Sequence, residues 1–185
     1  MTRVARTPAL IEDALHAAAR TQLPPALLGG AALTAAVIDR SRRYTSERDR
    51  LRATGGAAAA DLAARALFFT VADAGKLPLV LAELTPARAP AGWLTGATLR
   101  VLDVGAGCGA MTLGLLVELA ARGWGGQVVA TLLDRDAAAL AIARAAIATV
   151  AAELAIRCAV TTHAADVAAA PGGPFELVVA GTVVN

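Results

Sequence analysis

Three glycines in alternate positions follow a short apolar stretch near the middle of the chain. Residues 99–104 run directly into Gly105, Gly107 and Gly109. A strand that ends in such a turn lets the backbone approach a ligand closely, and the N-terminus of a following helix favours a negative group. Three alternate glycines after a strand therefore favour a ligand loop over a simple strand–helix turn. The spacing with Ala110 also fits the looser dinucleotide-binding pattern, so the glycines alone do not identify the ligand.

Three aspartates accompany this loop. Asp103 stands two residues before the first glycine, Asp134 ends the next apolar stretch, and Asp166 follows the third. An acid at the end of the second strand is placed to accept hydrogen bonds from ribose hydroxyls. A carboxylate at Asp103 disfavours a pyrophosphate and suits a ligand with a cationic amino group. Simpler roles stay open, because Asp134 could help to cap the next helix and Asp166 could belong to a turn.

The elements that must position these residues alternate between β-branched and alanine-rich segments. Short strands are expected at residues 99–104, 128–133, 156–161 and 175–180, and helices at residues 110–122 and 137–154. This alternation predicts βαβ units, a parallel sheet and right-handed crossovers, hence an α/β fold.

The first part of the chain has a different pattern. Residues 1–95 are expected to form a helical N-terminal region, with helices from Thr7-Pro8, over residues 26–40, around Phe68 and Phe69, and from Pro78. A linker is expected at residues 89–96, so that residues 96–185 form the second unit. Residues 1–100 carry 13 basic and 8 acidic side chains, whereas residues 101–185 carry 4 and 7.

Composition excludes several classes of protein. The 185 residues are 57% hydrophobic with a net charge of +2, which excludes a disordered chain and a polybasic tail. The longest uncharged stretch, residues 23–38, is too short for a membrane-spanning helix and contains two prolines. The two cysteines, Cys108 and Cys158, match no disulfide scaffold or metal-binding spacing. A reducing, cytoplasmic setting is expected, without a metal site.

Residues 101–109, Val-Leu-Asp-Val-Gly-Ala-Gly-Cys-Gly, resemble motif I of the class I S-adenosylmethionine-dependent methyltransferases. The resemblance covers residues 97–185 and implies a Rossmann-like sheet with S-adenosyl-L-methionine as the cofactor. It further implies that Asp134 binds the ribose and that Asp166 lies near the adenine amino group. Residues 178–185 carry neither the Asn/Asp-Pro-Pro-aromatic signature of base amino-group methylation nor the cysteine of pyrimidine C5 methylation, so no catalytic residue is predicted.

The helical region resembles that of the methyltransferase-like proteins of the small ribosomal subunit, which include mitochondrial ribosome-assembly members. The elements that carry this resemblance are residues 41–48, residues 66–76 and the ending at residues 180–185. It implies action on the small ribosomal subunit or its rRNA. Members often carry an iron–sulfur cluster in a later segment, and two cysteines cannot supply its four thiolates. Within an arginine-rich segment, Arg42, Arg43 and Arg48 are candidate RNA contacts, although a solvated helix with an Asp39–Arg43 pair would also explain them.

Two functions of different class remain open at this point. One is an enzyme that methylates rRNA, and the other is a non-catalytic ribosome-assembly module on a methyltransferase fold. A nicotinamide-dependent oxidoreductase is a third, weaker reading. The four expected strands are fewer than the seven usual for a methyltransferase sheet, so the chain is expected to be a C-terminally truncated fragment that is inactive alone.

Overall fold

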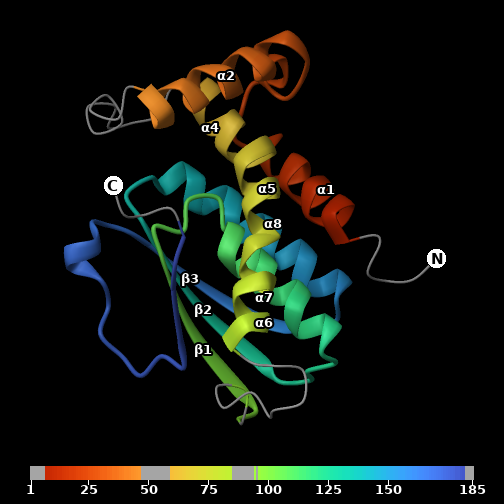
Figure 1. Ribbon diagram of the computed structural model, residues 1–185, viewed down its shortest axis with the longest axis vertical. Helices are drawn as coiled ribbons and strands as arrows, with labels where there is room; N and C mark the ends of the chain where they lie inside the picture. Colours follow the sequence, from red (N-terminus) through yellow and green to blue (C-terminus); the bar gives the residue numbers. More distant parts are fainter. Residues whose placement is uncertain (1–6, 47–58, 85–93, 95, 182–185) are drawn as a thin grey trace.

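Helices at the N-terminus precede a four-strand parallel sheet with interleaved helices (Figure 1). The computed structural model describes residues 7–46, 59–84, 94 and 96–181. The strands are β1 (Thr98–Val104), β2 (Gln127–Asp134), β3 (Arg157–Ala164) and β4 (Leu177–Ala180). The helices are α1 (Thr7–Ala19), η2 (Pro25–Leu27), α2 (Gly30–Ser46), α4 (Ala59–Ala64), the π-helical turn η3 (Arg65–Phe69), α5 (Thr70–Ala74), α6 (Lys76–Leu84), α7 (Ala110–Ala121), α8 (Ala137–Glu153) and η4 (Val167–Ala169). The predicted α/β class is confirmed.

The order of the strands reverses direction at one point in the sheet. The sheet has the order β3-β2-β1-β4 and every pair is parallel. The chain therefore steps outward from β1 to β3 and then returns to the other side of β1. In open parallel sheets, ligands bind beyond the carboxyl ends of the strands where this direction reverses. Here that point lies at the end of β1, where the three glycines follow.

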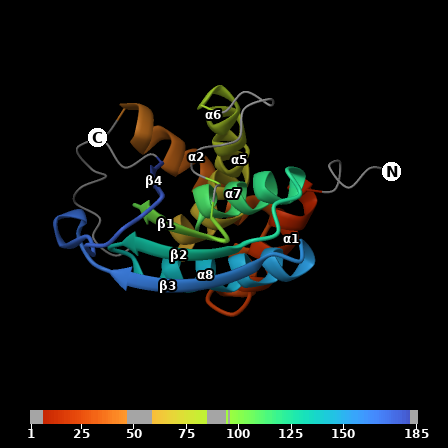
Figure 2. The same ribbon diagram turned by 90° about the horizontal axis from the view of Figure 1, so that it is seen from below.

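Five of the helices form two layers on one face of the sheet. Helices α7 and α8 connect the first three strands and lie next to them, while α1, α5 and α6 pack on the outer side of α7 and α8 (Figures 1 and 2). One hydrophobic cluster joins the layers and includes Leu15, Leu81, Leu116 and Leu132. The N-terminal helices thus share a core with the sheet.

A glycine allows the outer layer to approach closely. A Cβ added at Gly114 of α7 would stand 2.1 Å from the carbonyl oxygen of Ala74 at the end of α5. That distance is far inside van der Waals contact, so α5 and α7 pack in this way only without a side chain there. This contact holds the N-terminal helices against the element that follows the glycine turn.

Several observed boundaries differ from the predicted ones. The helix expected over residues 26–40 is replaced by a 3₁₀ turn and by α2, because Pro24 and Pro25 build a separate turn and Gly30 has a φ of +61°. Strand β3 extends to Ala164 because it pairs with β2 along its whole length. Strand β4 begins only at Leu177, where its pairing with β1 begins. The linker expected at residues 89–96 lies mostly outside the described residues.

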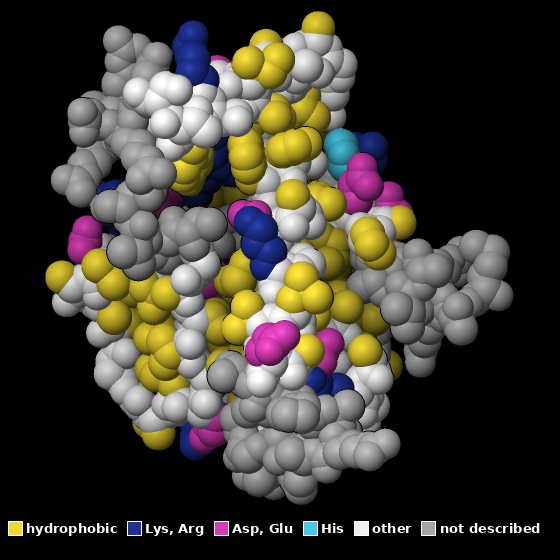
Figure 3. Space-filling model, viewed as in Figure 1, with side chains coloured by type: hydrophobic (Ala, Val, Ile, Leu, Met, Phe, Trp, Pro, Cys, Tyr) yellow, Lys and Arg dark blue, Asp and Glu magenta, His cyan; other side chains and the backbone are white. Residues whose placement is uncertain are grey.

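Parts of the surface are apolar. The space-filling view shows hydrophobic side chains gathered over the segment that leads from β3 to β4 (Figure 3). Val167 in η4, within this segment, and Val178 in β4 are each more than half exposed. Within the described ranges, none of the helices has the length and apolar character needed to span a bilayer.

Candidate functional site

The turn after β1 is built from left-handed backbone. Gly105, Gly107 and Gly109 have φ values of +65°, +52° and +88°, a region that favours glycine over residues with a side chain. The N–H of Ala106 donates to the carbonyl of Leu133 at 3.0 Å, and this bond ties the turn to the end of β2. The predicted ligand loop is therefore a tight turn that carries the chain from β1 into α7.

Asp134 holds this turn in place. Its Oδ2 accepts a 2.8 Å hydrogen bond from the N–H of Gly107, and its Oδ1 accepts one from the N–H of Asp136 at 2.9 Å. The cap of α8 is Asp136, whose Oδ1 accepts from the N–H groups of Ala138 and Ala139. Asp134 thus joins the ends of β1 and β2 by its carboxylate. Each oxygen retains a second lone pair for a ligand hydroxyl.

Asp103 is buried beneath the turn. The residue is 1% exposed, and its Oδ2 accepts hydrogen bonds from the Thr112 hydroxyl at 2.7 Å and the Thr112 N–H at 3.2 Å. Its Oδ1 is buried without a hydrogen-bond partner among the described residues. Burial raises the pKa of Asp103 to about 6, partly opposed by the Thr112 bonds and reinforced by the nearby charge of Asp134. The site therefore holds a buried carboxylate with unused hydrogen-bonding capacity.

Asp166 lies at the same edge of the sheet as Asp134. The N–H of Ala165 donates to the carbonyl of Asp134 at 3.0 Å, so the ends of β2 and β3 are adjacent. The Asp166 carboxylate is exposed, caps η4 through the N–H of Ala168, and stands 3.9 Å from Arg135. The turn role expected as an alternative is observed, and the exposed side chain is also accessible to a ligand.

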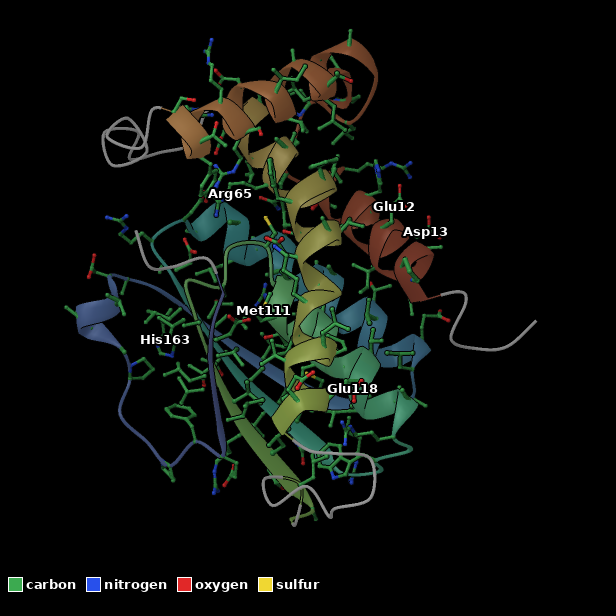
Figure 4. The ribbon with its side chains drawn as sticks, viewed as in Figure 1. Glu12, Asp13, Arg65, Met111, Glu118 and His163 are labelled. Carbon is green, nitrogen blue, oxygen red and sulfur yellow. The ribbon has the colours of Figure 1, made fainter. Side chains whose placement is uncertain are left out.

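Arg65 is a site residue that the sequence reasoning missed. It begins the π-helical turn after α4, and its Nη1 donates to Oδ2 of Asp136 at 2.6 Å. Its Nη2 lies 3.4 Å from the position that a Cβ at Gly107 would take. Figure 4 shows Arg65 on the side of this helical segment that faces the start of α8. In the sequence, the feature that could have indicated this residue is that Arg65 is a lone arginine in an alanine-rich stretch.

Burial and charge act in opposite directions on Arg65. Burial lowers its pKa, but attraction to Cys108, Asp136 and Asp134 and the hydrogen bond to Asp136 leave that pKa above its ordinary value. The guanidinium stays charged. Strand β4 ends at Ala180, and a Cβ added at the following residue, Gly181, would stand 2.8 Å from Cγ of Met111 in α7.

The cysteines contribute no nucleophile at neutral pH. Cys108 is 2% exposed within the turn, and burial raises the pKa of its thiol to about 12. Burial also raises the pKa of Cys158, to about 11. In the described part of the chain, no group of three or more His, Cys, Asp or Glu side chains could hold a metal ion.

Two of the three predicted RNA contacts, Arg42 and Arg43, lie apart from this site, on α2. Arg42 is 60% exposed and pairs with Asp39 at 3.1 Å. Arg43 is 13% exposed, pairs with Asp61 at 2.7 Å, and also forms the expected pair with Asp39 at 3.0 Å. Arg48 lies outside the described residues. Of the two described arginines, Arg42 is therefore exposed on the surface and Arg43 is largely buried.

No model of a known protein family matches the sequence, and no curated protein matches it significantly.

Proposed function

We propose that this protein binds S-adenosyl-L-methionine at the turn after β1 and is a class I methyltransferase, or a methyltransferase-like protein, of the small ribosomal subunit or its rRNA. The observation that carries the cofactor proposal is the left-handed turn of Gly105, Gly107 and Gly109, bonded to Asp134 where the strand order of the sheet reverses. The ribosomal part of the proposal is supported by the resemblance in the helical region.

The charges around the turn support a cationic ligand. Three carboxylates, those of Asp103, Asp134 and Asp136, lie at the ends of β1 and β2, and the Arg65 guanidinium pairs with Asp136 there. The carboxylates thus outnumber this guanidinium. This surplus repels a pyrophosphate and attracts a sulfonium or an ammonium group. The buried Oδ1 of Asp103 offers a further acceptor that a cationic group could satisfy, directly or through water. These observations favour S-adenosylmethionine over a nicotinamide dinucleotide.

Each residue would hold a different part of the cofactor. We expect the glycine turn to let the backbone approach the ligand, Asp134 to accept from the ribose hydroxyls, and Asp166, beyond the adjacent strand, to lie near the adenine. Bound S-adenosylmethionine supplies an activated methyl group, so the protein has mainly to orient the acceptor and exclude water.

Isothermal titration calorimetry tests the cofactor proposal. We expect S-adenosylmethionine to bind more tightly than S-adenosylhomocysteine, whose sulfur is uncharged, and much more tightly than NAD. Asp134→Ala should lower the affinity about tenfold or more, because a charged hydrogen-bond acceptor is lost at the ribose. Asp13→Ala, on the exposed side of α1, removes an equal charge as the control. Tighter binding of NAD would overturn the proposal.

Methyl incorporation tests the catalytic part. Small-subunit rRNA incubated with radiolabelled S-adenosylmethionine should gain label with the wild type and lose it with Asp134→Ala. Cofactor binding without incorporation into rRNA or assembled subunits would instead favour the non-catalytic assembly module.

A further inference from the structure

Arg65 links the helices that precede the sheet to the glycine turn. Its guanidinium hydrogen bonds to Asp136 at the start of α8 and lies over Gly107, although 71 residues separate Arg65 from Asp136. The side chain is 16% exposed, so it is held at the site and still reachable from solvent. π-Helical turns occur often at functional sites, and Arg65 begins one.

The segment that carries Arg65 is fixed against the turn at two further points. The Thr70 hydroxyl hydrogen bonds to the Cys108 thiol in the turn. Four residues later, the Ala74 carbonyl packs against Gly114 of α7. Residues 65, 70 and 74 of one helical segment therefore each make a contact at the site. Arg65 contacts the start of α8, Thr70 contacts the turn, and Ala74 contacts α7. The guanidinium is placed by this segment rather than by a loop.

Charge complementarity indicates what Arg65 would recognise. S-Adenosylmethionine carries a sulfonium, an ammonium and one carboxylate. The aspartates at the turn suit its two cationic groups, and Arg65 places a guanidinium beside Gly107 of the turn. The ligand's single anionic group and the Arg65 guanidinium beside the turn are therefore complementary.

We propose that Arg65 binds the carboxylate at the amino-acid end of the cofactor, an inference that rests on the proposed function. The planar guanidinium forms paired hydrogen bonds with a carboxylate, which the point charge of a lysine does not. Its bond to Asp136 uses Nη1, while Nη2 lies toward Gly107. The N-terminal helical region thereby supplies a determinant of ligand specificity to a site otherwise built from the sheet.

The test compares two ligands that differ in this carboxylate, S-adenosylmethionine and decarboxylated S-adenosylmethionine, by calorimetry on the full chain. Arg65→Gln should lower the affinity for S-adenosylmethionine about tenfold to a hundredfold, as expected for loss of a charge-assisted pair. The same substitution should leave the affinity for the decarboxylated ligand within about twofold. Arg65→Lys keeps the charge and should give an intermediate loss for S-adenosylmethionine alone.

Arg122→Gln is the matched control, because Arg122 forms a similar partly buried ion pair with Glu118 at the far end of α7. It should change neither affinity. Equal losses for both ligands in Arg65→Gln would mean that Arg65 only supports the structure, and would overturn this inference while leaving the proposed function intact. Failure of the wild type to bind either ligand would overturn the proposed function and this inference together.

Discussion

Asp61 and Arg65 lie four residues apart in one helical segment, and each forms an ion pair with a different part of the protein. Asp61 accepts hydrogen bonds from Arg40 at 2.8 Å and from Arg43 at 2.7 Å, both on α2. Arg65 pairs with Asp136 beside the glycine turn. This segment therefore connects the arginine-bearing helix to the candidate cofactor site through three buried or partly buried ion pairs.

Loss of Asp61 should destabilise the protein strongly. In Asp61→Ala, the Arg40 and Arg43 side chains, each 13% exposed, lose their shared carboxylate, and their Nε atoms are already without hydrogen-bond partners. Removing one member of a buried ion pair costs about 3–5 kcal/mol. Urea denaturation should show this loss in the free energy of unfolding. Asp39→Ala, whose carboxylate is 48% exposed, should cost no more than about 1 kcal/mol, and an equal cost for both variants would contradict the prediction.

The ionisation of Asp103 should make stability depend on pH. Its pKa is about 6 in the folded protein and 3.8 ordinarily, so the folded state binds the extra proton. The contribution of this group to the free energy of unfolding therefore rises as pH falls from above 6 toward 4, by about 3 kcal/mol in total. We expect the difference in stability between the wild type and Asp103→Asn to change by about 2 kcal/mol between pH 7.5 and pH 4.5, because the rest of the change falls below pH 4.5. If the free energies of unfolding of the wild type and Asp103→Asn changed in parallel with pH, the prediction would be refuted.

The close approach of α5 and α7 predicts an unusual response to alanine. Alanine in place of a helical glycine normally stabilises by about 1 kcal/mol. At Gly114, however, the new methyl group would overlap the Ala74 carbonyl, so Gly114→Ala should destabilise by about 1–3 kcal/mol. Gly75→Ala is the control, because its added Cβ has no neighbour within 4 Å and its φ of −71° suits alanine. In thermal unfolding, the melting temperature should fall for Gly114→Ala and rise for Gly75→Ala relative to the wild type.

Much of the sheet could be predicted because its signals are local. Alternating β-branched and alanine-rich segments indicate βαβ units wherever they occur, and the left-handed turn requires glycines that are visible in the sequence. The position of Asp134 followed in the same way, since an acid that ends β2 must lie next to the turn that ends β1.

The remaining features depend on contacts between distant residues. The carboxylate of Asp103 could be read as a ligand group, but its burial depends on the way Thr112 and α7 cover it. Arg65 carries no local motif, and its role follows only from the packing of its helix against the turn. Likewise, a run of arginines does not reveal which members point into the protein. Arg42 and Arg43 are neighbours in the sequence but differ in exposure because only Arg43 reaches Asp61.

That difference predicts separate effects of Arg42 and Arg43 on the proposed binding of rRNA. Arg42 is exposed on α2, so Arg42→Gln should weaken rRNA binding, reduce the slope of log affinity against log salt by about 1, and change stability by less than about 0.5 kcal/mol. Arg43→Gln should lower the free energy of unfolding by about 1–3 kcal/mol, because the buried Asp61 loses one of its two charged donors. Its effect on the salt slope should be smaller than that of Arg42→Gln. Filter binding over a range of salt concentrations, paired with urea denaturation, measures both quantities. If Arg42→Gln leaves the salt slope unchanged, α2 does not contact rRNA phosphates through this residue.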